Sequence, residues 1–509
     1  MTERPIQALQ ESGAVFDWAL RNASRKERLG NSEQAALWAY TAAGVASEFG
    51  HSHLCSAPLE SQLLRLGAGL RSTEPPRRRA PTREQQRWLH VYTMTASIGG
   101  HTAIGRRWIE RNPFGQRHSV LLTAQASVDI DPGLAKAVVR SGGEIHSLAL
   151  TDPLLRRAGK LREIAWNHAD VVVLHAHTWD VLPSIAFAVP GGPPVLLMNH
   201  ADHAFWVGCA VSDTIVDIRD SGLSLSTSFR GARGSAVLPV PLEDRGPAPH
   251  DRALLLSRLS DPSILSRGLI LLTIGSSQKY RPHGPLDFGE AIARVFEAVD
   301  DCALLAVGPS PTDPPWAQIA ERTAGRAVAV GLDADLAPWH AAADLYVESF
   351  PVGSYTALLE VGLAERAFVR KPWLVPPSVL MLDRGALAEF EPPTEPDEYA
   401  VAVISLARDP IRRNALALQA RRAVLDWHCG AAWDAQLEAL QRSIPSQHNV
   451  GFAFEPRPIP LPLAEYSAAL YTRRLHGSPL AFAEDTARQQ GLAPRTDVAL
   501  LEAMRKVQS

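Results

Sequence analysis

A loop of small residues, 350–354, stands between an apolar run that ends at Glu348 and a helical pattern that begins at about Tyr355. A helix that starts in such a loop presents backbone N–H groups and the positive end of its dipole, which suits phosphate oxygens. Thr356 adds a hydroxyl in the first turn, and Glu360 adds a carboxylate that could accept hydrogen bonds from a ribose. The pattern predicts a site for a nucleotide diphosphate; the alternative is a capped turn with a surface glutamate.

A lysine follows the first expected strand of the second half of the chain. Lys279 lies on a loop with Ser277, at the carboxyl end of an expected parallel sheet, where ligands bind in such folds. Its ammonium could neutralise a diphosphate, although a solvated loop lysine would give the same pattern. Gly308 and Gly331 each follow a further strand and are added to the predicted nucleotide site.

A histidine follows a glycine pair in the first half of the chain. Gly99 and Gly100 come soon after the first expected strand, and glycine lets a backbone approach a diphosphate closely. His101 is the one titratable side chain between Met94 and Arg106. Because histidine titrates near neutral pH, it is a candidate general base; the alternative is a histidine that caps a helix.

Two further histidines stand close together after another expected strand. His200 and His203 flank Asp202, which invites a metal-site interpretation. No third cluster completes such a site, so we expect a loop that lines the sugar or acceptor pocket, with both histidines as further catalytic candidates. His175 and His177, at the end of a neighbouring strand, are also candidates.

Short apolar runs alternate with helical patterns twice along the chain, which indicates βαβ units and parallel sheets covered on both faces. The first series has expected strands at 88–94, 119–123, 144–148, 171–175, 195–198, 214–217 and 235–240, with helices at 132–140 and 153–168. The second has strands at 269–274, 303–307, 327–330 and 344–348, with helices at 287–299, 315–323, 336–342 and 355–364. A stretch rich in proline and charge, 239–251, is expected to link the two series.

These patterns predict an α/β protein of four parts. A helical N-terminal extension and linker occupies 1–80, and a first Rossmann-like domain occupies 85–242. A second Rossmann-like domain follows at 250–443, and a helical tail at 444–509. A chain of 509 residues is expected to fold around more than one core.

Composition excludes several classes of protein. A net charge of −3 offers no general basic field, so we expect no nucleic-acid partner. The four cysteines are scattered, which argues against a disulfide framework or a zinc ribbon and suits a reducing cytosol. The first residues lack the apolar run of a signal peptide, and no long uncharged apolar stretch occurs. We therefore expect a cytoplasmic protein that does not span a membrane.

Taken in order, the loop lysine, the two strands that end in Val-Gly and the loop before the helix resemble the second half of GT-B glycosyltransferases. The segment Phe350-Pro-Val-Gly-Ser-Tyr-Thr356 looks most like the Phe-Pro-x-Gly-Gly-x-Thr loop of the O-GlcNAc transferase and bacterial protein N-glucosyltransferase relatives. The resemblance covers roughly residues 88–364 in pattern and some thirty residues in motif. It implies a GT-B fold, in which two Rossmann-like domains face a cleft.

The resemblance also implies roles for individual residues. Gly353, Ser354, Tyr355 and Thr356 would form the loop that holds the phosphates, Lys279 would take the diphosphate, and Glu360 would take the ribose. The segment 331–339 would neighbour the base. His101 matches the Gly-x-His that lies at the sugar in the O-GlcNAc transferase family.

The chain departs from the family patterns at three points. Retaining GT-B enzymes carry two glutamates eight positions apart in this loop, and the first of those positions is Val352 here. Ser354 replaces the second glycine of the protein-transferase loop. The N-terminal helices show no tetratricopeptide period, so the acceptor is expected to differ from that of O-GlcNAc transferase.

Together these observations predict a metal-independent glycosyltransferase that moves one hexosyl unit from a nucleotide-sugar, with UDP expected ahead of GDP or dTDP. The nucleotide-sugar would be a co-substrate, and no cofactor is expected. The acceptor stays open between protein, peptide, lipid-linked glycan and small molecule, as does assembly into homo- or hetero-oligomers. The alternatives are a non-hydrolysing UDP-sugar epimerase and an inactive GT-B subunit that supports a partner transferase. The missing glutamate pair and the histidine candidates favour inversion.

Overall fold

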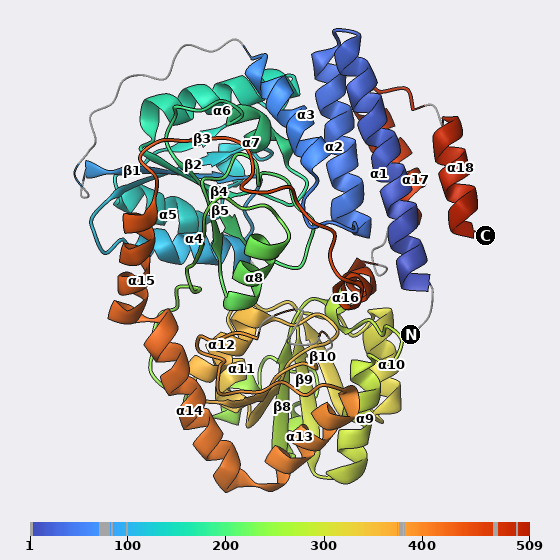
Figure 1. Ribbon diagram of the computed structural model, residues 1–509. Helices are drawn as coiled ribbons and strands as arrows, with labels where there is room; N and C mark the ends of the chain where they lie inside the picture. Colours follow the sequence, from blue (N-terminus) through green and yellow to red (C-terminus); the bar gives the residue numbers. More distant parts are fainter. Residues whose placement is uncertain are drawn as a thin grey trace. The chain divides into compact units, whose positions relative to one another are not determined.

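A computed structural model describes residues 4–70, 82, 85–97, 100–373, 375, 380, 382–471, 477–494 and 497–508. The chain divides into two compact units, each built around a parallel sheet (Figure 1). The seven-stranded unit consists mainly of residues 2–239 and 434–509, and the five-stranded unit of residues 240–378 and 382–433. Residues 434–443, expected in the second domain, thus belong with the first sheet, as do both terminal extensions.

The seven-stranded sheet has the order β3-β2-β1-β4-β5-β6-β7, with every pair parallel. Its strands are β1 (Arg87–Tyr92), β2 (Arg117–Leu122), β3 (Ile145–Ser147), β4 (Val171–His175), β5 (Val195–Asn199), β6 (Thr214–Asp217) and β7 (Ser235–Val237). The helices that connect them are α4 (Gly100–Arg111), α5 (Pro132–Arg140), α6 (Leu154–His168), α7 (Val181–Ala186) and α8 (Asp220–Ser228), with a short 3-10 turn at Ser127–Asp129. Parallel strands need such crossovers, which is why strand and helix patterns alternate in the sequence.

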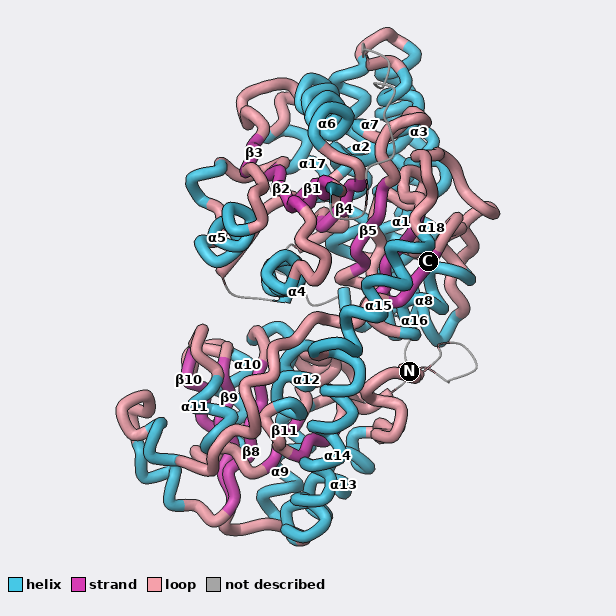
Figure 2. The backbone as a smooth tube through the Cα atoms, turned by 90° about the vertical axis from the view of Figure 1, so that its left-hand side faces the viewer, coloured by secondary structure: helices cyan, strands magenta, loops and turns pink. Residues whose placement is uncertain are grey.

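Side chains alternate between the two faces of this sheet, and each face has its own core. Leu89 and Val91 of β1 point toward the core shared with α6, α7 and the terminal extension. Tyr92 of the same strand packs on the other face, against residues of α4 and α5. Figure 2 shows α4 and α6 on opposite sides of the strands. The polar side chain of His90 therefore shares the α4 face with Tyr92, a placement that matters for the site below.

The five-stranded sheet has the order β10-β9-β8-β11-β12 and is also parallel. Its strands are β8 (Leu269–Ile274), β9 (Cys302–Val307), β10 (Ala327–Gly331), β11 (Leu345–Val347) and β12 (Ala367–Val369). Its helices are α9 (Phe288–Ala298), α10 (Pro314–Arg322), α11 (Ala337–Ala342), α12 (Tyr355–Leu363), α13 (Pro396–Arg408) and α14 (Pro410–His428), with 3-10 turns η3 (Arg252–Leu255), η4 (Pro262–Ser266) and η5 (Ser277–Tyr280). Helix α9 begins where the Asp287 carboxylate accepts from the N–H of Glu290, as expected of an N-cap aspartate.

The two terminal extensions pack together. The N-terminal helices are α1 (Arg4–Arg28), α2 (Ser32–Phe49) and α3 (Ala57–Ala68), and the C-terminal ones are α15 (Gly430–Ser443), α16 (Leu461–Tyr471), α17 (Pro479–Gln489) and α18 (Val498–Gln508). Helix α1 contacts α2, α16, α17 and α18, and both views show the first and last helices side by side (Figures 1 and 2). Within the described ranges, no helix is long and apolar enough to cross a membrane.

Polar contacts join the N-terminal extension to the first sheet. The Glu33 carboxylate accepts from the N–H groups of Leu154 (2.6 Å) and Leu155 (3.1 Å), at the start of α6. Arg162 of α6 donates to the carbonyl oxygens of Gly67 and Ile185. These contacts explain why the extension is part of the seven-stranded unit and does not stand apart from it.

Glu60 of α3 is a buried anchor of the same kind. Its carboxylate accepts from the N–H groups of Gly208 (2.6 Å), Cys209 (3.1 Å) and Ala210 (3.4 Å), in the loop that follows β5. Burial raises the pKa of Glu60 from 4.5 to about 7, although these hydrogen bonds lower it. The protonated carboxyl is therefore favoured in the folded protein, and ionisation opposes folding.

We expect the wild-type protein to lose stability relative to Glu60→Gln as the pH rises. A carboxyl whose pKa is raised on folding stabilises the fold below its ordinary pKa of 4.5, and that stability is lost as the pH rises through about 7. One pKa unit is worth about 1.4 kcal/mol, so the difference in unfolding free energy should change by roughly 3 kcal/mol across this window. Urea unfolding of both proteins at several pH values measures it. The exposed Glu163→Gln serves as control, and a pH-independent difference for Glu60→Gln would contradict the expectation.

Candidate functional site

The loop from β11 to α12 closes the carboxyl end of the five-stranded sheet. The Ser349 hydroxyl donates to the carbonyl oxygen of Val352 (2.8 Å), and the Tyr399 hydroxyl donates to that of Glu348 (2.9 Å). Ser354 is the N-cap residue of α12, and the first turn of the helix leaves its N–H groups without acceptors inside the helix. The expected strand, loop and helix are thus present, with the helix N-terminus at the edge where ligands bind in parallel sheets.

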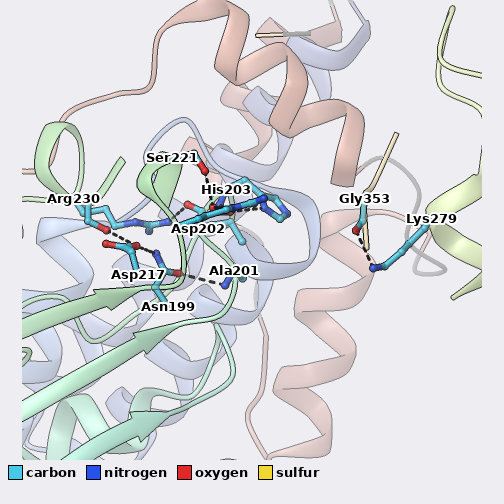
Figure 3. Close-up of polar contacts among 12 residues, drawn as sticks. Asn199, Ala201, Asp202, His203, Asp217, Ser221, Arg230, Lys279 and Gly353 are labelled. Atoms are coloured by element: carbon cyan, nitrogen blue, oxygen red, sulfur yellow. Dashed lines mark hydrogen bonds and ion pairs between the residues drawn. The ribbon is translucent and has the colours of Figure 1, made fainter. Parts of the chain in front are cut away.

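Lys279 lies at this helix N-terminus. Its ammonium donates to the carbonyl oxygen of Gly353 (Figure 3) and to the hydroxyl of Ser354, both at 3.0 Å. Burial lowers the pKa of Lys279 to about 8, and the nearby carboxylate of Glu348 opposes that shift. The structure therefore places a cation, a serine hydroxyl and the positive end of a helix dipole at one point, which is a favourable place for an anion.

Three glycines keep the space around this point small. A side chain at Gly353 would place its Cβ 2.3 Å from Oε1 of Glu348, so the loop can only pass there as glycine. Gly308 has a φ of 117°, and its Cβ would lie 2.3 Å from the carbonyl oxygen of Gly275. Gly275 itself faces the Ser354 hydroxyl, at 2.8 Å from the position of a Cβ. Backbone from three loops thus converges beside Lys279.

The other predicted members of the nucleotide site lie on the same elements. Ser277 opens η5, the turn that carries Lys279, and Gly331 ends β10, where its carbonyl oxygen accepts from the N–H of Gly308 (2.7 Å). Tyr355 and Thr356 occupy the first turn of α12 and are partly exposed.

Glu360 is partly exposed one turn further along α12, and its charge acts on His340 of α11. His340 is buried, which lowers its pKa to about 4. Helix α11 thus lies beside Glu360, the predicted ribose residue. The segment 331–339, which includes the start of α11, is the one predicted to neighbour the base.

Histidines gather at the carboxyl end of the seven-stranded sheet. His101, on the first turn of α4, lies with its ring centroid 4.4 Å from that of His200, 5.6 Å from that of His177 and 6.2 Å from that of His175. The His175 ring stacks on Tyr92, with centroids 4.4 Å apart and planes at 5°. The fold therefore brings together His101 and His200, which are far apart in sequence.

The imidazoles of this cluster are held neutral. Burial lowers the pKa of His101 to about 4, helped by His177, while a hydrogen bond to the backbone of His175 opposes the shift. Burial also lowers the pKa of His200 and of His175 well below the ordinary value. In the described part of the chain, Nε2 of His101 and Nδ1 of His200 have no hydrogen-bond partner. A neutral imidazole with a bare nitrogen can accept a proton, which is the chemistry of a general base.

His203 has a different environment. Its Nδ1 lies 3.0 Å from Oδ1 of Asp202 (Figure 3). The carboxylate of Asp202 also accepts two hydrogen bonds from Arg219, at 2.6 and 3.0 Å. The Arg219 cation and His203 hold the pKa of Asp202 well below its usual range against the effect of burial. The pair Asn199 and Asp217 lies beside it, with the amide donating to the carboxylate at 2.6 Å.

These contacts bear on the metal-site interpretation of the 199–203 segment. Both carboxylate oxygens of Asp202 accept hydrogen bonds from Arg219, and the His203 ring contacts Asp202. Among the described residues, no group of three or more histidine, cysteine, aspartate or glutamate side chains is placed to hold a metal ion.

Of the two glycines predicted before His101, the structure describes one. Gly100 is the first residue of α4, directly before His101, whereas Gly99 lies outside the described residues. Sequence reasoning did not single out His90 and His118, which line the α4 face behind the cluster. The period of two would have placed them on one face, because His90 alternates with Leu89 and Val91 in β1, and His118 lies two residues before Val120 in β2. Gly275 was also missed, although it directly follows β8.

Solved structures share this fold. HepE of Anabaena, in complex with UDP and glucose, is 14% identical, with 71% of this chain and 100% of that chain covered and a TM-score of 0.51. A glycosyltransferase from Rickettsia africae is 12% identical, with 70% and 97% covered and a TM-score of 0.50. An O-GlcNAc transferase of Thermobaculum terrenum is 13% identical, with 85% and 81% covered and a TM-score of 0.49.

No protein-family model matches the sequence, and no curated protein is similar to it in sequence. At these low identities the solved structures establish the fold. The predicted α/β fold of GT-B glycosyltransferases is confirmed.

Proposed function

We propose that this chain is a glycosyltransferase that transfers a hexosyl unit from a UDP-sugar to an acceptor, with no metal ion and no other cofactor. The observation that carries the proposal is the Lys279 ammonium at the N-terminus of α12, in contact with Gly353 and Ser354. The UDP bound to HepE, a structure of the same fold, supports the choice of nucleotide.

The donor half of the reaction belongs to the five-stranded unit. Lys279 and the first N–H groups of α12 would neutralise the diphosphate, and so do the work that a divalent cation does in other enzymes. Glu360, one turn along the same helix, would accept from the ribose hydroxyls. As the sugar leaves, negative charge grows on the diphosphate, and the same groups would stabilise it.

The acceptor half belongs to the histidine cluster of the seven-stranded unit. An acceptor hydroxyl or amide that attacks an anomeric carbon must lose a proton, and His101 and His200 each have a ring nitrogen without a hydrogen-bond partner among the described residues. Val352 leaves the loop without the first glutamate of the retaining pair, which favours inversion. We infer transfer to an acceptor rather than epimerisation of the sugar, because a base for an incoming nucleophile is present.

A nucleotide screen with and without chelator tests the proposal. We expect UDP to raise the melting temperature more than GDP or dTDP, since a ligand at about a hundred times its Kd stabilises by roughly 2.7 kcal/mol. EDTA should leave both UDP binding and UDP release from a UDP-hexose unchanged, because lysine and helix N–H groups serve the diphosphate. If binding or release required added manganese, the metal-free mechanism would be wrong.

Product analysis separates transfer from the alternatives. Incubation with UDP-hexoses should release UDP, whereas an epimerase of the non-hydrolysing kind would return a different UDP-sugar. If the folded protein bound no nucleotide, the assignment of a nucleotide-sugar site to the five-stranded unit would be wrong.

A further inference from the structure

Four imidazoles form a continuous hydrogen-bonded chain behind the candidate base. Nδ1 of His118 lies 3.0 Å from Nε2 of His90, and Nδ1 of His90 lies 3.0 Å from Nε2 of His175. Nδ1 of His175 in turn lies 3.1 Å from Nε2 of His200. We call these four residues the histidine chain.

The histidine chain follows from the strand order. Its members come from β2, β1, β4 and the end of β5, which are consecutive neighbours in the sheet. His90 pairs in register with Val120 of β2 and Val173 of β4, so its ring lies between those of His118 and His175 on the α4 face. The chain therefore crosses the sheet from the beginning of β2 to the carboxyl end of β5.

The outer end of the chain fixes the direction of every hydrogen bond in it. Asn112 donates from Nδ2 to the carbonyl oxygen of Gln116 (2.7 Å), and its Oδ1 accepts from the N–H of the same residue (2.8 Å). These two bonds set which amide atom is the oxygen, and that oxygen faces Nε2 of His118 at 3.4 Å. An oxygen without a hydrogen can only accept, so His118 carries its proton on Nε2.

The other tautomers follow one from the next. With Nε2 protonated, neutral His118 has a bare Nδ1 and must accept from Nε2–H of His90. By the same step His90 accepts from Nε2–H of His175, and His175 accepts from Nε2–H of His200. His200 is left with a bare Nδ1, the atom that has no partner among the described residues.

We propose that the histidine chain is a proton relay that fixes Nδ1 of His200 as the proton-accepting atom and carries the accepted proton away from it. This inference rests on the proposed function, because it assigns the relay to the deprotonation of the acceptor. His118, His90 and His175 are positioning residues, since they act through His200 and not on the substrate.

The relay step balances. An acceptor O–H or N–H bond breaks, and its proton bonds to Nδ1 of His200. The Nε2 proton of each imidazole then passes to Nδ1 of the next, which leaves His200, His175 and His90 neutral in their other tautomer. His118 gains a proton on Nδ1, keeps the one on Nε2, and so carries the positive charge beside the Asn112 oxygen.

Electrostatics around His200 favour moving this charge. The titratable groups that face it are His101 from α4, His175 from β4 and His177 from the loop after β4. All are imidazoles, so none of them supplies a negative charge that would hold a proton on His200. Burial disfavours a proton there, and a charged His101 or His177 would disfavour it further. At the far end, His118 faces His90, Trp88 and the Asn112 oxygen, and Asn112 is partly exposed.

Nitrogen NMR of the full chain, labelled with ¹⁵N in histidine, tests the relay without any turnover. Comparison with His200→Gln assigns the His200 signals. We expect wild-type His200 to be neutral at neutral pH, with the proton on Nε2 and a bare Nδ1. A proton on Nδ1, or an even mixture of tautomers, would overturn the proposal.

Asn112→Gly tests the anchor. Asn112 has a φ of 29°, which glycine adopts without strain, so the fold should survive. Although Asn112 does not contact His200, we expect loss of its oxygen to mix the His200 tautomers. Unchanged tautomers in this variant would show that the chain does not set them.

Turnover adds a second, separate readout. His90→Phe interrupts the chain with a ring of similar size, and we expect kcat for transfer to fall by about tenfold or more while donor KM and UDP affinity stay unchanged. His146→Phe, on β3 outside the chain, is the matched control. Unchanged kcat in a folded His90→Phe protein would overturn the relay. If the tautomers are as expected but no nucleotide-sugar is turned over, the proposed function is wrong, while the assigned direction of the hydrogen bonds in the histidine chain is retained.

Discussion

Lys279→Ala is expected to weaken UDP binding more than tenfold, which corresponds to about 1.4 kcal/mol. The ammonium contacts both Gly353 and Ser354, so its removal takes away the cation that makes these two contacts at the N-terminus of α12. The fold should remain intact, because Lys279 lies on a short turn that is held by Tyr280, whose hydroxyl contacts that of Thr273 at 3.1 Å. Isothermal titration with UDP measures the affinity.

The matched control is Lys160→Ala, which removes an exposed lysine paired with Glu163 and should leave UDP affinity unchanged. The wild-type protein offers a second check. Since the pKa of Lys279 is about 8 without ligand, the ammonium is charged below that value and neutral above it. UDP affinity should therefore fall as the pH rises through about 8, and this fall should vanish in Lys279→Ala. A folded Lys279→Ala protein with wild-type affinity for UDP would end the assignment.

His200→Ala is expected to lower kcat by about 10²–10⁴-fold, the range that a positioned base contributes, and His101→Ala is expected to lower kcat as well, because its ring packs against that of His200. Their rings lie 4.4 Å apart, and each has a bare nitrogen, so one substitution leaves the other without its neighbour in the same small space. UDP affinity should change little, because the diphosphate contacts belong to the five-stranded unit. Parallel measurement of kcat and UDP affinity separates the two effects.

His203→Ala is the comparison variant in this series. Sequence grouped His203 with the other candidates, but its imidazole is engaged with Asp202, and we expect a smaller loss of kcat. If His203→Ala alone lost activity, the base would lie on that part of the loop. If all three variants kept their kcat, catalysis by these histidines would be excluded, and a carboxylate such as Asp202 or a retaining mechanism would have to be considered.

The donor loop shows why part of the candidate site was predictable. Glu348, the loop residues and the start of α12 are consecutive in sequence, and the geometry of a strand, a tight loop and a helix N-terminus is set locally. The loop lysine needed one further step, which is that the carboxyl ends of parallel strands meet at one edge. Sequence placed Lys279 at that edge, but the contact with Ser354, 75 residues away, had to come from the structure.

The histidines show the limit of that reasoning. His101, His175 and His200 each stand at the carboxyl end of a different βα unit, so the sequence could place them on one edge but could not tell which rings meet. The convergence depends on strand order and register, and on the alternation that turns His90 toward α4. The sequence also could not indicate that Asn112 orients His118, because this depends on the amide oxygen lying between Gln116 and His118.

By itself, the sequence determined the alternation of strands and helices, the two parallel sheets and the presence of a phosphate-type helix N-terminus, because these follow from periodicity and local turn chemistry. Only the tertiary structure decided that the terminal extensions join the first sheet, through carboxylates such as the half-buried Glu33 and the buried Glu60. It also decided that four histidines line up while His203 turns to Asp202. Side chains that meet across strands are fixed by the order in which the strands assemble, and that order is set by the packing of the whole unit rather than by any local stretch of chain.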